Sequence, residues 1–340
     1  FNIDFRPEIT TSYEGGFSFS LFDGRLGSDI SYYRNFTKDQ ILRVPLDFST
    51  GFSSAILNAG KVRNVGVEVS INANPIKTKF FRWNTTINWA KNQNRVLELA
   101  DGIGDRQDIG YGGNATIQAR VGGTTGDIYG FGFVRSPDGQ IVFNANGTTA
   151  RGPEIQYIGN AYADWRGGIS NEFSYKSFRF NFLIDGQYGG MVYSQTHHKM
   201  AEQGKLTKTL PGREEGFVIG NGVVLNADGT YRPNTTKLSP ASYYGDYYRR
   251  ANVESNSFDA SFVKLREVRF EYSLPKTMVS KLKLNQVTLG LYGRDLAMIT
   301  NFPMFDPETA ALNGSTLLPG IEMGQLPSQR TFGLNLTIKL

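Results

Sequence analysis

The chain of 340 residues contains no cysteine, only two histidines and only three tryptophans. Without cysteine it has no disulfide, no thiolate nucleophile and no cysteine-ligated metal site. No stretch approaches 18 consecutive apolar residues, which excludes a helical membrane protein. The mean hydropathy of -0.33 is polar. Even so, 24 phenylalanines and 17 tyrosines make the chain unusually aromatic for a soluble enzyme.

The net charge of +5 comes from 36 basic and 31 acidic residues. The basic residues are scattered among the acids and form no run of lysine and arginine. Nucleic-acid binding proteins concentrate their basic residues in a patch or stripe. We therefore expect a solvated surface of mixed charge and no nucleic-acid partner.

Apolar and polar residues alternate with a period of two, as strands in a wall between lipid and water require. From Val65 to Ala73 the odd positions are apolar, while the even positions from Asn64 to Asn74 are polar or glycine. The pattern recurs in about nine segments, near residues 13–21, 26–32, 65–73, 81–89, 165–175, 178–187, 267–274, 287–294 and 332–340. It predicts an all-β fold, a transmembrane antiparallel β-barrel.

The connections between these segments alternate between short and long. Short ones lie near residues 23–25, 75–79, 176–177 and 275–284, and long ones near 37–60, 91–161, 189–257 and 298–329. Outer-membrane barrels have short periplasmic turns and long extracellular loops, so we expect a periplasmic C-terminus. Bacterial single-chain barrels have an even number of strands, so nine strands predict a fragment of a larger barrel.

A soluble β-sandwich or propeller would also show alternation and turns. Three features disfavour it. Aromatic residues lie near the strand ends on the apolar face, as in an aromatic girdle, and the polar face carries charges. In addition, the long connections exceed what a compact domain needs.

Five segments resemble the SusC/RagA family of TonB-dependent transporters of Bacteroidota. They are NAGKVRNVGVEVSINANP (58–75), IGNAYADWRGGISNEFSYKSFRFNFLIDGQYGG (158–190), SFVKLREVRFEYSLPK (261–276), GRDLAMITNFPMFDPE (293–308) and QRTFGLNLTIKL (329–340). They follow the family's order across nearly the whole chain. The sequence departs at Asp295, where asparagine is commoner, and at Leu340, where phenylalanine is more usual. Neither change alters the alternation.

The resemblance implies that residues 1–340 are the C-terminal part of a plugged barrel of about 22 strands in the outer membrane. The plug, the N-terminal extension and the segment that contacts the TonB complex would lie outside this sequence. The implied function is TonB-dependent import of oligosaccharide or peptide beneath a SusD-like surface lipoprotein. The alternative is a structural or assembly scaffold that holds surface lipoproteins without moving solute.

Ten charged residues lie at polar positions of the alternating segments, where they would face the lumen and not the outer-membrane lipid. They would form a polar path or anchor the plug, or they would form a ladder of opposite charges across neighbouring strands. These residues are Glu68, Arg82, Arg166, Glu172, Arg179, Asp185, Glu267, Arg269, Glu271 and Arg294.

An aromatic cluster in the third long connection is a candidate contact for substrate or for the lid protein. Flat amphipathic rings offer large contact area at low entropic cost. An internally packed loop is the alternative. The cluster consists of Tyr243, Tyr244, Tyr247, Tyr248, Arg249 and Arg250.

The sequence predicts no catalytic group, metal or cofactor. His197 and His198 are adjacent in a long connection, where neighbouring side chains point apart, so we expect two solvated histidines. Asp101, Asp105 and Asp108 do not fit the spacing of a calcium loop. A barrel enzyme would need a nucleophile and a base that converge, which these residues do not supply, so we expect a protein that is not an enzyme.

Overall fold

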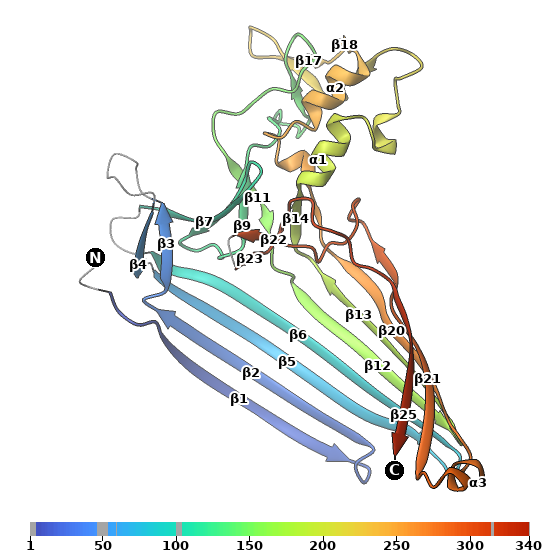
Figure 1. Ribbon diagram of the computed structural model, residues 1–340. Coiled ribbons are helices and arrows are strands. Elements are labelled where there is room, and N and C mark those ends of the chain that lie inside the picture. Colours follow the sequence, from blue (N-terminus) through green and yellow to red (C-terminus); the bar gives the residue numbers. More distant parts are fainter. Residues whose placement is uncertain (1–4, 46–53, 59, 100–103, 314–315, 340) are drawn as a thin grey trace.

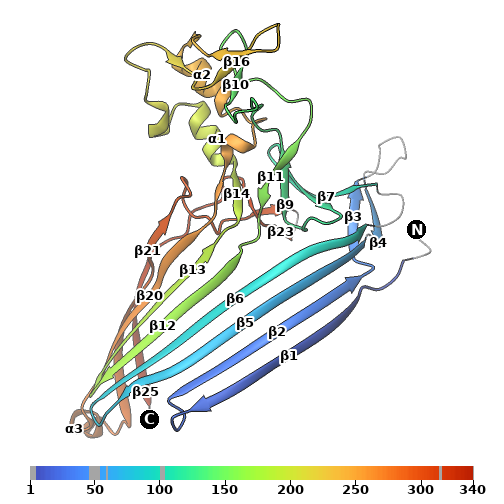
Figure 2. The ribbon, with the colours of Figure 1, turned by 180° about the vertical axis from the view of Figure 1, so that it is seen from behind.

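The computed structural model describes residues 5–45, 54–58, 60–99, 104–313 and 316–339. Nine antiparallel strands form one curved sheet in the order β1-β2-β5-β6-β12-β13-β20-β21-β25 (Figures 1 and 2). Their bounds are β1 (Ile9–Leu21), β2 (Leu26–Lys38), β5 (Gly60–Lys77), β6 (Phe81–Leu99), β12 (Trp165–Tyr175), β13 (Phe178–Tyr188), β20 (Phe262–Ser273), β21 (Gln286–Thr300) and β25 (Thr331–Lys339). The nine predicted strands and the barrel fold class are confirmed.

Strand pairing places most of the apolar residues of the nine strands on one face. Ile30 of β2 lies opposite Val69 of β5, while the next residue, Ser31, lies opposite Glu68. Large side chains on this apolar face are widely exposed, whereas soluble proteins rarely expose large continuous apolar patches. On β25, for example, Phe332 is 74% and Leu334 is 82% exposed. The two faces of the sheet therefore require two different surroundings.

The short turns gather at one end of the sheet and the long connections at the other (Figure 1). The turn between β1 and β2 uses left-handed backbone at Phe22 and Asp23, with φ of 57° and 52°. The turn between β12 and β13 does the same at Lys176. Between β20 and β21 the connection carries α3 (Lys276–Val279) and the 3-10 turn η4 (Ser280–Leu282).

The predicted start of the second long connection was wrong. The sequence predicted a connection from residue 91, but β6 continues to Leu99 and pairs with β5 along the added length. Over this stretch Lys91 and Gln93 lie opposite Val67 and Val65, so positions on the apolar face of β6 turn polar. The alternation disappears there although the backbone ladder continues.

The long connections contain short elements of their own. The first holds β3 (Ile41–Pro45) and β4 (Ser54–Asn58), and the second holds β7 (Arg106–Gly112), β8 (Ala115–Arg120), β9 (Asp127–Gly130), β10 (Val142–Phe143) and β11 (Gln156–Asn160). The third holds β14 (Met191–Ser194), α1 (Gln195–Glu202), η2 (Thr207–Thr209), β15 (Val218–Ile219), β16 (Val223–Leu225), β17 (Tyr231–Pro233), β18 (Lys237–Leu238), α2 (Pro240–Tyr247), η3 (Glu254–Asn256) and β19 (Ser257–Asp259). The fourth holds β22 (Ala311–Asn313), β23 (Thr316–Leu318) and β24 (Ile321–Glu322). Within the described ranges, none of the helices combines the length and the apolar character that crossing a membrane needs.

The second, third and fourth connections share one hydrophobic core above the sheet. Ile128 of the second, Tyr193 and Val253 of the third, and Ile321 of the fourth are all fully buried in it. Strand pairing ties the same segments together, because β14 pairs with β19 and, in parallel, with β24. We call this unit the outer domain (Figure 2).

Candidate functional site on the polar face of the sheet

All ten charged residues that the alternation singled out lie on one face of the sheet. Strand pairing places Arg179 opposite Glu271 and Glu267 opposite Arg294. Ala90 of β6 lies between Glu68 and Arg166, because it pairs with Glu68 of β5 on one side and with Arg166 of β12 on the other. The register places the rest on the same face, which we call the polar face; they are Arg82, Glu172, Asp185 and Arg269.

Most of these charges form a ladder of cross-strand ion pairs. Arg294 Nε lies 2.8 Å from Glu267 Oε2, and Arg179 reaches Glu271 at 3.5 Å and Glu172 at 3.8 Å. Solvent screens these partly exposed pairs, so each adds little to the stability of the sheet. Their position favours the ladder interpretation for this part of the face.

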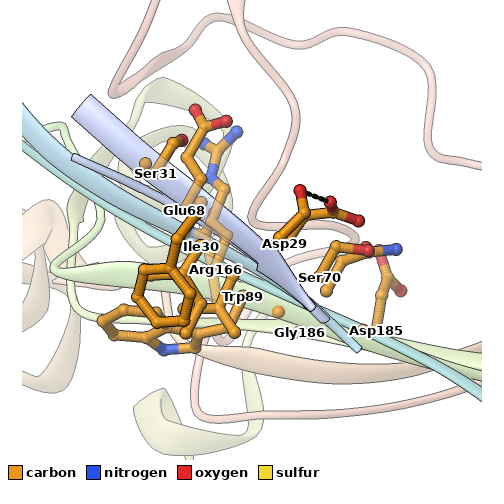
Figure 3. A pocket seen from close by; sticks show the side chains of 18 of the residues that line it. Asp29, Ile30, Ser31, Glu68, Ser70, Trp89, Arg166, Asp185 and Gly186 are labelled. Carbon is orange, nitrogen blue, oxygen red and sulfur yellow. Dashed lines mark hydrogen bonds between the residues drawn. The ribbon is translucent and has the colours of Figure 1, made fainter. Parts of the chain in front are cut away.

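A recess of about 740 Å³ lies on the polar face and extends across the neighbouring strands β1, β2, β5, β6, β12 and β13 (Figure 3). Glu68 and Arg166 point into it. Neither side chain has a hydrogen bond or ion pair with any other residue that the structure describes, so both charges are available to a ligand. The polar residues around them are Ser18, Asp29, Ser31, Ser70, Asn88, Asp185 and Gln187. Ser18 donates a hydrogen bond to Asp29, the dashed line in Figure 3.

One wall of the recess is Glu308, which comes from the connection between β21 and β25. The ammonium of Lys264 on β20 holds this connection against the sheet. Lys264 is 3% exposed, and its Nζ donates to both carboxylate oxygens of Asp306 at 2.8 Å and also to Glu308. Burial would raise the pKa of the Asp306 carboxyl, but the hydrogen bonds it accepts, led by those from Lys264, lower it below the usual range.

A second cation completes this cluster. Arg266 donates from Nε to Asp185 at 2.7 Å and from Nη2 to Glu308 at 2.5 Å, and its Nη1 lies 3.4 Å from Asp295. The register of β20 with β21 shifts between residues 265 and 267, and Asp295 has a φ of 52°. We call these residues the latch; they are Asp185, Lys264, Arg266, Asp295, Asp306 and Glu308.

Sequence reasoning found only Asp185 of the latch as a site residue. Arg266 lies in a bulge, which breaks the period of two on which the analysis depended. The charge of Lys264, next to the break in the alternation, was the one signal in the sequence that could have pointed to the latch. Asp306 and Glu308 come from a connection whose path the sequence does not fix.

The tyrosine cluster lies on and just after α2, which begins at the N-cap Ser239 and has Pro240 in its first turn. The rings pack mainly on one another: Tyr247 and Tyr248 have centroids 4.9 Å apart, and Tyr243 and Tyr244 5.1 Å apart. Tyr244 is buried and donates to the carbonyl of Pro211 at 3.0 Å. Burial raises the pKa of Tyr248 to about 12.

The two arginines of this cluster differ. Arg249 Nη1 lies 3.0 Å from Asp246 Oδ1 and also contacts Thr149, so it ties the third connection to the second. The side chain of Arg250 is exposed. The contacts of the rings and of Arg249 account for a packing role within the outer domain.

The expectation of solvated histidines was wrong. His197 and His198 lie on α1 and are 0% and 1% exposed. His197 Nδ1 lies 2.8 Å from Asn256 Oδ1, and His198 Nδ1 donates a hydrogen bond to the carbonyl oxygen of Tyr248 at 2.7 Å. Adjacent side chains on a helix do point apart, but packing of α1 against the segment after α2 covers both.

Because His197 is buried, we expect the stability of the outer domain to depend on pH. Burial lowers the pKa of His197 to about 4. In the unfolded chain the imidazole titrates near 6.5, so below that pH the unfolded state binds a proton that the folded state excludes. The contribution of His197 to the free energy of unfolding is therefore complete above about pH 6.5. It falls by roughly 3 kcal/mol as the pH drops to 4. Hydrogen exchange of α1 in the intact protein at pH 7.5 and 5 measures this loss.

The matched variant is His197→Gln, which keeps a polar side chain but does not titrate. We expect it to lower the protection of α1 at pH 7.5 and to remove the additional loss between pH 7.5 and 5 that arises from this residue. An unchanged pH dependence in the variant would show that His197 does not control it.

The residues that the structure describes include no group of three or more metal-binding side chains that could hold an ion. Of the three aspartates weighed for calcium, Asp101 lies outside the described residues. Asp108 accepts hydrogen bonds from Tyr111 at 2.5 Å and from Gln118 at 2.7 Å.

Comparison with known proteins agrees with this geometry. Residues 1–124 match the family described as "TonB dependent receptor-like, beta-barrel". TonB-dependent receptor P3 of Formosa agariphila is 27% identical over 368 residues, which cover 99% of this chain and 35% of that protein. TonB-dependent receptor SusC of Bacteroides thetaiotaomicron is 25% identical over 364 residues, which cover 100% of this chain and 32% of SusC. The chain thus spans about a third of these relatives.

Among solved structures, the RagAB peptide transporter shares the fold, with a TM-score of 0.70 at 18% identity over 98% of this chain and 35% of that one. The sheet and these matches define an outer-membrane β-barrel of the TonB-dependent receptor class. Within that class the chain is similar to about a third of SusC and shares its fold with the same share of RagAB. The relatives are receptors and transporters and not enzymes.

Proposed function

We propose that the protein imports oligosaccharide or peptide across the outer membrane, powered through the TonB complex and assisted by a SusD-like lipoprotein over its outer mouth. The long connections would be extracellular, the C-terminus periplasmic, and the polar face would line the lumen beside a plug. The match to TonB-dependent receptor barrels supports the barrel and its class, and RagAB, a protein of similar fold, is a peptide transporter.

The recess on the polar face carries this proposal. Glu68 and Arg166 offer an unpaired acceptor and an unpaired donor in one space bounded by amide, hydroxyl and carboxylate groups. A cargo hydroxyl or ammonium group would donate to Glu68, while a cargo carboxylate or hydroxyl oxygen would accept from Arg166. Import breaks no covalent bond, so reversible hydrogen bonds of this kind are the chemistry that a transport path needs.

Replacing either free charge is expected to weaken cargo uptake. Glu68→Gln and Arg166→Gln keep the size and polarity of each side chain but remove its charge. A lost charge-assisted hydrogen bond costs about 1.5–3 kcal/mol, so the half-saturating cargo concentration should rise roughly tenfold or more. Uptake of labelled oligosaccharide or peptide by cells that express the intact receptor measures it.

Two residues on the same face but outside the recess provide matched controls. Glu14→Gln on β1 and Arg82→Gln on β6 make the same chemical changes at exposed positions. Uptake by both should stay within about twofold of the parent receptor. Equal losses in recess and control variants would refute a cargo role for the recess.

The scaffold alternative makes a different prediction. If the barrel only holds surface lipoproteins, removing TonB would leave cargo uptake unchanged while the lipoprotein still co-purifies with the receptor. Import requires that uptake fall to background without TonB. Comparing uptake and lipoprotein recovery in the same strain therefore separates the two functions.

A further inference from the structure

The apolar face carries a groove at its loop end, formed by a row of residues across five strands. Pairing sets Trp89 of β6, Gly167 of β12, Gly186 of β13, Val263 of β20 and Ile299 of β21 side by side. The second and third members are glycines and have no side chain. Neighbouring strands lie about 4.8 Å apart, so two bare strands leave a notch between the indole of Trp89 and the valine.

The rows on either side of this notch are large. Towards the middle of the sheet, Ile169 lies opposite Ile184, and towards the loops Trp165 lies opposite Tyr188. The rings of Trp165 and Tyr188 are stacked, with centroids 6.1 Å apart and an angle of 20° between planes. The resulting groove has a volume of about 550 Å³, within the range of small-molecule sites.

The chemistry of the groove changes along its length. Its walls are aromatic and aliphatic, while Ser261 and Asn301 line it at the loop end of β20 and β21. Tyrosine and tryptophan mark the level where the hydrocarbon of a bilayer meets the lipid headgroups. A molecule in the groove would therefore have a long apolar part and a polar end near the loops.

We propose that this groove binds one fatty-acyl chain of a membrane lipid from the outer leaflet, with the ester end of the lipid at Ser261 and Asn301. The argument for this occupant is continuity, because the groove is part of the face that the barrel presents to membrane hydrocarbon. The exposure of the groove fits this role: Val263 is 50%, Tyr188 is 56% and Ile299 is 77% exposed in the protein alone.

The two glycines differ in what they allow. A Cβ on Gly186 would lie 2.5 Å from the carbonyl oxygen of Phe262, so the backbone requires glycine there. A Cβ on Gly167 would lie 3.2 Å from the carbonyl oxygen of Asn88 and 3.5 to 3.6 Å from the rings of Trp89 and Trp165. A larger side chain at 167 would thus fill the notch after a small adjustment of the strand.

The test is photolabelling of the intact receptor in phosphatidylethanolamine vesicles that contain a phosphatidylcholine with a diazirine on its acyl chain. Peptides that contain Trp165 and Tyr188 should be labelled roughly fivefold more than those with the exposed Tyr13 and Phe17 of β1, because a bound chain stays longer than bulk lipid. Gly167→Leu should reduce labelling of the groove peptides to the level of β1.

The control is Gly15→Leu, which adds the same side chain on β1, on the apolar face of the sheet but outside the groove. A Cβ at Gly15 meets nothing within 4 Å. This variant should leave labelling of the groove unchanged. Heat-modifiable migration on gels shows that each variant is a folded barrel, and Trp165→Leu replaces Gly167→Leu if the latter does not fold. Equal labelling of groove and β1 peptides would overturn the proposal. So would labelling that appears only after a lipoprotein is added, since the chain would then come from that partner's anchor.

Discussion

Replacing Lys264 with methionine should release the connection between β21 and β25 from the sheet. The substitution removes the ammonium that Asp306 and Glu308 share and leaves the carboxylate of Asp306, which is 5% exposed, without its main partner. Breaking a buried ion pair by removing one partner costs about 3–5 kcal/mol. Limited proteolysis of the intact receptor should then cut within residues 301–330 at least tenfold faster.

The matched control is Lys339→Met, the same change at an exposed lysine near the other end of the sheet. It should leave the cleavage rate of residues 301–330 unchanged. Because Glu308 is a wall of the recess, Lys264→Met should also weaken cargo uptake. Cleavage at the parent rate would show that contacts other than the latch hold this connection.

Truncating Ile321 to alanine should loosen three connections at once. Its side chain is fully buried in the core that it shares with Ile128, Tyr193 and Val253. An isoleucine truncated in such a core costs about 2–5 kcal/mol, because apolar contacts are lost and a cavity remains. Hydrogen exchange should therefore speed up together in β9, β14 and β24, although only β24 carries the substitution.

Leu326→Ala serves as the control, since Leu326 lies in the same connection as Ile321 but is 87% exposed. It should change exchange in the outer domain by less than about 0.5 kcal/mol. Faster exchange confined to β24 in Ile321→Ala would show that the three connections fold independently and would contradict a shared core.

The strands could be read from the sequence because each strand must satisfy a local rule. A residue such as Val67 or Glu68 is selected by which side of the wall it faces, and that choice repeats every two residues along the chain. The rule failed where its cause ended. Beyond the apolar band, β6 continues through Lys91 and Gln93 with polar residues on both faces, and at the β20 bulge Arg266 falls out of the period.

The sequence by itself determined the nine strands, their two unlike faces and the side of the wall on which each charge lies, because these follow from neighbours along the chain. Only the tertiary structure decided the latch, the buried histidines and the glycine notch. Lys264 is 42 residues from Asp306, and His197 is 59 residues from Asn256. Such contacts depend on how separate connections pack, and packing of distant segments leaves no periodic trace in the sequence.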